Sequence, residues 1–203
     1  MIVLYGYPHS RSARVAWVLE ELGLDYEYRM VDLKSGSGQQ PEHLARHPDG
    51  KVPVLCDGDL TLFESAAICR YLAAQYGKGR LLPECIAEQA VVDQWLSFVT
   101  TELEQPLWTQ AKHSFLFPEA QRREEIIPVA RWEFDKAVQA LQRRFDGQDY
   151  VTGTLSLADL FLAQTLAWAR GMVKHELPEA LDTYTNELIA RPAFERARKR
   201  EAC

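Results

Sequence analysis

The chain has 203 residues and a formal net charge of −6, and 47% of its residues are hydrophobic while 26% are charged. This length fits one large domain or two small ones, and the composition is that of an ordinary globular protein. The negative charge argues against binding a nucleic-acid backbone, which calls for a basic surface. No apolar run approaches membrane-spanning length, so neither nucleic acid nor a membrane is an expected partner.

The chain opens with the pattern of a small α/β unit. Residues 2–5 form an apolar strand, and residues 6–12 form a polar elbow. Apolar residues at 15, 18, 19 and 22 have the spacing of an amphipathic helix that Gly23 closes. The alternating segment 26–30 predicts a second strand, so the whole is a right-handed βαβ unit. Residues 32–50 follow as a long loop with one short helix over 41–46, and loops of this length usually serve a function.

Pro53 interrupts an apolar strand over residues 52–55. A proline cannot donate to a sheet ladder, so it needs an edge, a bulge or a special turn. A cis Val52-Pro53 bond would turn the N–H and C=O of Val52 outward, where they can pair with an extended peptide.

A hairpin and a helix start come next. Asp57-Gly58-Asp59 joins strands over 54–56 and 60–63, and Glu64-Ser65 opens a helical run. Ser65 and the free amides of the first helical turn suit a carboxylate, while Glu64 beside them suits an ammonium group. Together they predict a receptor for an amino-acid head group attached to a short peptide.

Everything after the linker at 77–83 predicts helix. The expected helices span 86–104, 118–145, 156–168 and 179–190, and a last one follows Pro192. Ser156 to Asp159 has the pattern of a capping box, with Leu155 and Leu160 placed as a hydrophobic staple. Asp159 is therefore predicted to be a helix-start carboxylate and not a catalytic acid.

Other polar residues have plain structural interpretations. The basic run over 196–200 predicts a solvated helix end that complements the helix dipole. The cysteines form no CxxC or zinc spacing, and scattered reduced thiols suggest a cytoplasmic protein without a visible secretory signal; they are Cys56, Cys69, Cys85 and Cys203. His43 and His47 are spaced like metal ligands but lack a third ligand, so we expect surface histidines and no metal.

The segment from His47 to Pro53, followed by Phe63-Glu64-Ser65 behind a βαβ pattern, resembles the glutathione S-transferase superfamily over nearly the whole chain. The resemblance implies a thioredoxin-like α/β domain over 1–77, a linker over 78–86 and an all-α helical bundle over 87–203. It also implies a bacterial-type member with a serine-type elbow, a cytoplasmic homodimer, and glutathione as substrate or cofactor.

The resemblance also implies roles for single residues. Glu64 and Ser65 match the positions that hold the γ-glutamyl head of glutathione, and Val52 matches the position that pairs with its cysteinyl backbone. Pro53 matches the cis proline of the family. Lys51 falls near the glycyl end, and Gln39 is a further candidate for the glycyl carboxylate, although Lys51 alone is also compatible with a plain surface lysine.

The thiol-activating group should lie at the elbow, where the family places tyrosine, serine or cysteine. A thiol with a pKa of about 8.5 must lose about two units to be mostly thiolate at neutral pH, and a hydroxyl donor can supply part of this shift. The elbow has no cysteine, which disfavours the cysteine-dependent classes. Ser10 is the favoured catalytic residue and Ser12 the second, with Tyr5 and Tyr7 as further hydroxyls. Ser12 is equally suited to cap the first helix.

These features favour an enzyme that conjugates the glutathione thiolate to a small hydrophobic electrophile. One alternative is a glutathione-dependent isomerase of the maleylacetoacetate isomerase type. Another is a non-catalytic adaptor like the stringent-starvation regulator of bacterial RNA polymerase, since fold does not settle function. The intact Glu64-Ser65 pair favours the enzyme.

Overall fold

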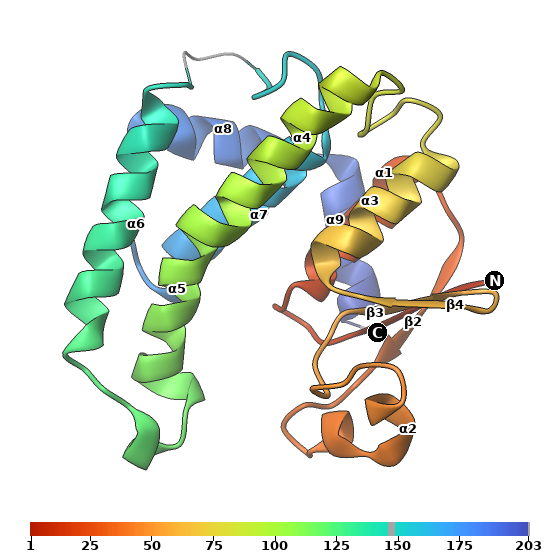
Figure 1. The fold of residues 1–203 in the computed structure, drawn as a ribbon, viewed down its shortest axis with the longest axis horizontal. Helices are drawn as coiled ribbons and strands as arrows, with labels where there is room; N and C mark the ends of the chain where they lie inside the picture. Colours follow the sequence, from red (N-terminus) through yellow and green to blue (C-terminus); the bar gives the residue numbers. More distant parts are fainter. Residues whose placement is uncertain (146–148, 203) are drawn as a thin grey trace. The chain divides into compact units, whose positions relative to one another are not determined.

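The computed structural model describes residues 1–145 and 149–202 (Figure 1). Its contacts form two compact units, one of residues 1–84 with the chain from 189 onward, the other of Cys85–Leu188. The predicted linker over 78–86 stays a prediction, but the end of the predicted second domain differs from these units, because the final helix packs on the first helix. No helix in the described part of the chain is long and apolar enough to cross a membrane.

The first unit is built on a four-stranded mixed sheet. In the sheet order β2-β1-β3-β4, β1 runs parallel to β2 and antiparallel to β3, and β3 forms the predicted hairpin with β4. The strands span Ile2–Gly6 for β1, Tyr26–Met30 for β2, Val54–Asp57 for β3 and Leu60–Phe63 for β4. The predicted thioredoxin-like α/β domain is confirmed.

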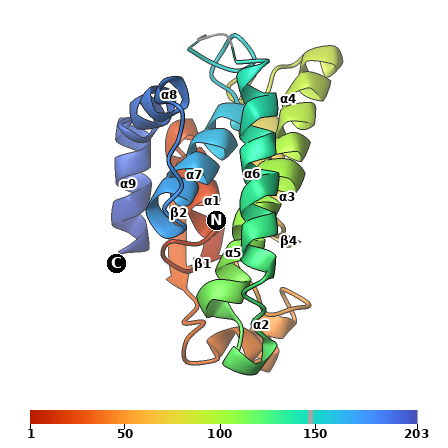
Figure 2. The ribbon, with the colours of Figure 1, turned by 90° about the vertical axis from the view of Figure 1, so that its left-hand side faces the viewer.

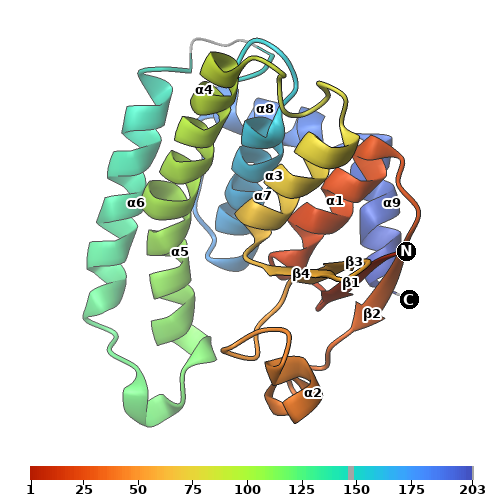
Figure 3. The same cartoon turned by 45° about the vertical axis from the view of Figure 1, so that its right-hand side comes forward.

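Two helices cover one face of this sheet, α1 (Ser12–Leu22) and α3 (Ser65–Tyr76), while the short α2 (Pro41–Leu44) lies on the other side (Figure 3). The apolar face of each helix meets the apolar face of the strands, as their periods require. The fully buried side chains at this interface include Leu4, Leu55, Val15, Leu19, Ile68 and Leu72. Each such side chain contributes about 1.5–3 kcal/mol to folding.

The last helix, α9 (Pro192–Glu201), belongs to this unit and packs along α1. The ring of Phe194 meets Trp17 edge-on at 4.8 Å between centroids. The guanidinium of Arg196 binds the carboxylate of Glu20 at 2.8 Å. The predicted basic helix end is confirmed, since Arg198, Lys199 and Arg200 lie in the last turn and most of the run is exposed. The ion pair with α1 is an additional contact that the sequence did not indicate.

The second unit is helical, as predicted (Figure 2). Its helices are α4 (Ile86–Phe98), α5 (Glu104–Ala111), α6 (Ile126–Gln142), α7 (Leu157–Met172) and α8 (Glu179–Ile189). The first half of α7 is buried on every side, because its sequence is apolar all round.

Two helices differ most from the boundaries that the sequence predicts. The helix expected over 86–104 continues through π-helical turns at Val99–Leu103 and Lys112–Leu116, which flank α5. The helix expected over 118–145 begins only at Ile126. Pro128 explains this start, because proline is tolerated only in the first turn of a helix.

The start of α7 is the predicted capping box. The backbone N–H of Ser156 donates to Asp159 at 2.8 Å, and the buried carboxylate also accepts the Val151 N–H at 2.8 Å and the Tyr184 hydroxyl at 2.7 Å. Burial raises the pKa of Asp159, while these hydrogen bonds oppose the shift. The carboxylate thus ties the preceding loop, the start of α7 and α8 together, which confirms its structural role.

Replacing Asp159 by alanine should lower the free energy of unfolding by about 3 kcal/mol, because several buried donors lose their acceptor at once. Tyr184→Phe removes one of these donors and should cost about 1 kcal/mol. Urea denaturation of both variants measures the difference. Equal losses in the two variants would contradict the central place of this carboxylate.

Candidate functional site

Three predicted site segments meet at the same end of the strands in the sheet of the first unit. In the register, Tyr5 of β1 pairs with Val54 of β3, and Val54 pairs with Phe63 of β4. Neighbouring strands lie about 4.8 Å apart. The elbow after β1, Pro53 before β3 and Glu64 after β4 are therefore neighbours at this end of the strands. The sheet therefore brings together segments that are up to 58 positions apart in the sequence (6 to 64).

The elbow is ordered by its two serines. The hydroxyl of Ser10 donates to the carbonyl of Tyr7 at 2.6 Å and lies 2.9 Å from the hydroxyl of Ser12. The backbone N–H of Ser12, the first residue of α1, donates to the Ser10 oxygen at 3.1 Å. Ser10 thus bonds the first amide of α1 from just outside the helix. Arg11 is the N-cap residue, so the alternative in which Ser12 caps this helix is wrong.

The two serines differ in their access to solvent. Ser12 is 0% exposed, and its oxygen accepts the N–H of Tyr7 at 3.3 Å. Ser10 is only partly buried. A hydroxyl that meets a dissolved ligand needs exposure, so Ser10 is the better placed of the two serines.

The tyrosines of this region have other contacts. The hydroxyl of Tyr5 accepts a hydrogen bond from Arg29 at 3.1 Å, and the guanidinium of Arg46 lies 4.4 Å from the centre of its ring. Tyr7 takes part in the elbow through its backbone. The side chain of Tyr5 is thus directed to Arg29 and Arg46, whereas Tyr7 meets Ser10 and Ser12 through its main chain.

The loop from 36 to 51 is held by close contact between two glycines. A Cβ on Gly50, whose φ is +63°, would lie 2.4 Å from the carbonyl oxygen of Gly38 and 2.5 Å from the side-chain amide nitrogen of Gln39. Gln39 therefore lies against the residue that precedes Lys51. The Lys51 ammonium pairs with Asp49 at 2.5 Å and remains exposed to solvent. The two candidates for the glycyl end of glutathione are thus neighbours.

His43 and His47 are buried, with 4% and 5% exposure, so the prediction of surface histidines is wrong. The Nε2 atom of His43 lies 2.9 Å from the carbonyl oxygen of Lys51, and the Asp49 N–H donates to Nδ1 of His47 at 3.1 Å. Burial lowers the pKa of His47, and the charge of Glu64 opposes the shift. These histidines brace the turn before Pro53, and no sequence signal distinguishes this role from exposure.

The remaining predicted residues occupy the two ends of the hairpin. The Val52-Pro53 bond is cis, and Pro53 is buried. Glu64 is exposed and has a φ of 70° as it enters α3, while Ser65 begins the helix and is buried. The first amides of α3 have no partner within the helix, so an exposed carboxylate and free N–H groups stand together.

No group of three potential ligands among His, Cys, Asp and Glu occurs in residues 1–145 and 149–202. Cys56, Cys69 and Cys85 are free, and burial raises the pKa of the Cys69 thiol. Cys203 lies outside the described residues.

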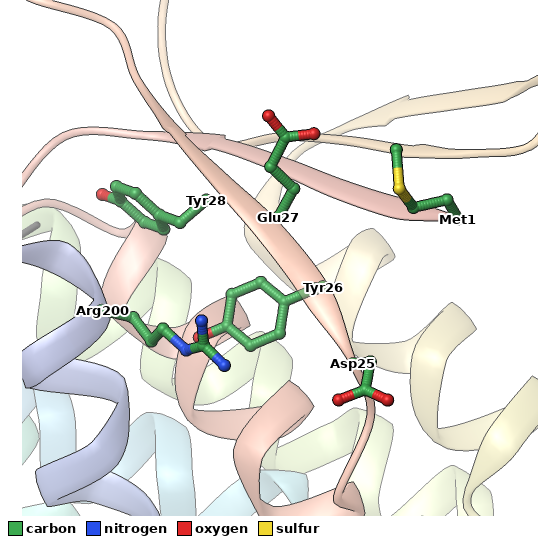
Figure 4. A pocket seen from close by; sticks show the side chains of 6 residues that line it. All are labelled: Met1, Asp25, Tyr26, Glu27, Tyr28 and Arg200. Carbon is green, nitrogen blue, oxygen red and sulfur yellow. The ribbon is translucent and has the colours of Figure 1, made fainter.

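A hollow of about 610 Å³ lies elsewhere on the first unit, beside β2 and α9 (Figure 4). Its lining includes Tyr26, Tyr28 and Arg200, and the Arg200 guanidinium lies 5.5 Å from the centre of the Tyr26 ring. None of the predicted site residues lines this hollow. The hollow lies beside the outer strand β2, whereas the predicted site residues lie at the end of the strands where the elbow follows β1.

Comparison with known families agrees with this geometry. Residues 1–74 match the glutathione S-transferase N-terminal domain, and residues 105–192 match the glutathione S-transferase C-terminal domain. The chain belongs to the glutathione S-transferase family. The predicted family and class of enzyme are confirmed.

Individual relatives refine the class. Glutathione S-transferase 4 of Zea mays is 33% identical over 200 residues, which cover 95% of this chain and 89% of the relative. The structure of glutathione transferase F7 from Populus trichocarpa matches with a TM-score of 0.87 at 27% identity, over 99% of both chains. These plant relatives favour the plant-type (phi) class, so the expected bacterial type is corrected.

A bacterial structure also matches. The theta class glutathione S-transferase from Xanthomonas axonopodis pv. citri, with glutathione bound, is 32% identical with a TM-score of 0.81 and covers 97% of this chain and 96% of its own. The shared fold thus extends across plant and bacterial members of the family.

Gly50→Ala should destabilise the first unit more than Gly36→Ala. Both positions have positive φ, so both variants carry the same backbone penalty of about 1–2 kcal/mol. A Cβ at Gly36 meets nothing within 4 Å, whereas one at Gly50 meets backbone. Urea denaturation measures the two losses, and equal values would contradict the close contact between residues 38 and 50.

Proposed function

We propose that this chain activates the thiol of glutathione and transfers it to a small hydrophobic electrophile. The observation that carries the proposal is the register Tyr5–Val54–Phe63, which places the elbow, the cis proline segment and the start of α3 at the same end of the strands. Three segments suited to the thiol, the peptide backbone and the amino-acid head of glutathione thus adjoin. The family membership supports the same chemistry.

The start of α3 fits the γ-glutamyl head. Its free amides and the Ser65 hydroxyl suit the α-carboxylate, and the exposed Glu64 suits the ammonium group. The backbone of Val52, just before the cis bond, is proposed to pair with the cysteinyl residue. Gln39 and Lys51 lie together across Gly50 and are proposed to meet the glycyl carboxylate.

Ser10 is proposed to stabilise the thiolate. Its hydroxyl oxygen lies 2.6 Å from the carbonyl oxygen of Tyr7, to which it donates its single hydrogen. Rotation of the hydroxyl would let it donate to the sulfur instead and so lower the pKa of the bound thiol. A serine is too weak an acid to serve as a base at neutral pH, so Ser10 stabilises negative charge and does not remove the proton. Ser12 is proposed to support Ser10 from within the core.

The thiol proton passes to solvent. The thiolate then attacks the electrophilic carbon and forms a carbon–sulfur bond, while the leaving group departs with its electron pair or a double bond accepts the electrons. Binding both reactants converts a bimolecular step into one within a complex. We further propose a cytoplasmic homodimer. A panel of model electrophiles distinguishes a transferase from an isomerase or a binding adaptor, which would bind glutathione without forming a conjugate.

Glu64→Ala should weaken glutathione binding at least tenfold, because loss of a charged hydrogen-bond partner costs about 1.5–3 kcal/mol. Glu64→Gln keeps the size of the side chain and should lose a similar amount. Isothermal calorimetry measures both, with Glu88→Ala as a control that removes an exposed acidic residue from α4. Unchanged affinity in both Glu64 variants would exclude this site.

Ser10→Ala should raise the pKa of the bound thiol and lower turnover by about ten- to a thousandfold, with little change in glutathione affinity. It should also cost about 1 kcal/mol of stability, since the amide of Ser12 loses its hydrogen bond to the Ser10 hydroxyl. Ultraviolet titration of the thiolate measures the pKa, and denaturation measures the loss of stability. Ser12→Ala is the matched control, and a larger pKa change there would transfer the role to Ser12.

A further inference from the structure

The residue just before Ser10 has an uncommon backbone conformation. His9 has a φ of 59°, in the left-handed region that residues with a Cβ rarely adopt. Such a conformation persists only where the surroundings impose it. The direction in which the chain enters Ser10 therefore depends on what holds His9.

The side chain that contacts His9 comes from the far end of the sequence. One terminal nitrogen of the Arg198 guanidinium, on α9, lies 3.1 Å from Nδ1 and 3.4 Å from Nε2 of His9. Arginine has only donors, so the ring nitrogen that accepts must carry its lone pair. Burial and the positive charge of Arg198 lower the pKa of His9, which keeps the imidazole neutral and able to accept.

Arg198 is in turn held by a buried carboxylate. Its other terminal nitrogen binds Glu201, one turn later on α9, at 2.5 Å. The side chain of Glu201 is only 1% exposed, and burial raises its pKa to about 7 against the opposing effect of Arg198. Pairing with Arg198 thus fixes the guanidinium between Glu201 and His9.

The elbow is also backed from the strand beside α9. A Cβ on Gly6 would lie 2.5 Å from the hydroxyl oxygen of Tyr28 and 2.8 Å from the Cβ of Ser12. The ring of Tyr28 therefore lies directly behind the turn that carries Ser10, on the strand next to α9.

Helix α9, which carries Arg198 and Glu201, is fixed to α1 by several contacts. Besides the contact of Phe194 with Trp17, Arg191 binds both carboxylate oxygens of Glu21, at 2.6 and 2.9 Å. Figure 3 shows α9 running along α1 towards the strands. A side chain near the end of such a helix has a defined place, which a positioning role requires.

We propose that Arg198 is a positioning residue for the elbow: by holding His9 in the left-handed conformation, it sets where Ser10 presents its hydroxyl. Glu201 keeps the guanidinium in place. Arg198 acts through His9 and does not touch the thiol. The inference rests on the proposed function of Ser10 and adds the terminal helix to the parts on which that function depends.

The test compares Arg198→Ala with Arg196→Ala, which removes another ion pair of α9 with Glu20 but leaves His9 alone. Arg198→Ala should raise the pKa of the bound thiol and lower kcat on the order of tenfold, since small displacements of a reacting group are costly. KM for glutathione should change less than threefold, because the head group is held at α3. The amide NMR resonances of residues 7–12 should move in Arg198→Ala and stay in place in Arg196→Ala.

The resonances separate the two proposals. Elbow resonances that stay in place in Arg198→Ala overturn the positioning role. Resonances that move while turnover and thiol pKa stay constant support the positioning contact and contradict the proposed function of Ser10. An equal decrease of kcat in the Arg198 and Arg196 variants would mean that only the packing of α9 on α1 matters, and this result would overturn the inference.

A second experiment uses the variant His9→Gly. His9→Gly accepts a positive φ without the penalty of a Cβ, so adding Arg198→Ala to it should change kcat less than twofold. A full tenfold loss in that background would mean that Arg198 acts by another route. Should Arg198→Ala fold poorly, Arg198→Lys keeps a charge for Glu201 but loses the two-sided guanidinium geometry, and its bound thiol pKa should still rise.

Discussion

The pairing of Tyr5 with Val54 and of Val54 with Phe63 is the constraint on which the rest of the site depends. Side chains alternate between faces along a strand, so a slip of one residue in either pairing would turn the apolar face of β3 away from α1 and α3. The fully buried Leu55, which pairs with the fully buried Leu4, fixes this register through the core. The same hydrophobic packing that stabilises the sheet thus sets the positions of the elbow, the cis proline and the start of α3.

The residues that hold the loops of the site are buried, whereas the residues proposed to contact glutathione are exposed. Ser12, His43 and His47 are inaccessible and hold backbone groups through their polar atoms. The residues proposed to meet glutathione, such as Gln39 and Glu64, are exposed. Burying a polar group costs free energy unless it finds a partner, and each of these residues bonds a specific backbone atom of the loop that it braces, although Nδ1 of His43 has no partner in the described part of the chain. This arrangement fixes the loops and leaves their outward side chains available to a ligand.

Much of this could be predicted from local sequence patterns. The strands, α3 and the capping box at Ser156 follow from periodicity and helix-start chemistry, and the segments around Pro53 and Glu64 carry their own turn signals. The burial of His43 could not be predicted, because it depends on the distant carbonyl of Lys51. The docking of α9 was missed for a similar reason: a basic helix end has the same pattern whether it faces water or Glu20.

The contact between Arg198 and His9 joins residues 189 positions apart, which no sequence period can indicate. It also explains a feature that local propensity leaves unexplained, since histidine rather than glycine occupies a left-handed position at the elbow. Glycine would adopt the conformation more easily, but it has no ring to accept from Arg198, and it would increase the freedom of the unfolded chain. A histidine held from outside gives a turn whose geometry is set by tertiary contact. In this fold α9 therefore packs with the first unit and contacts the elbow that precedes α1.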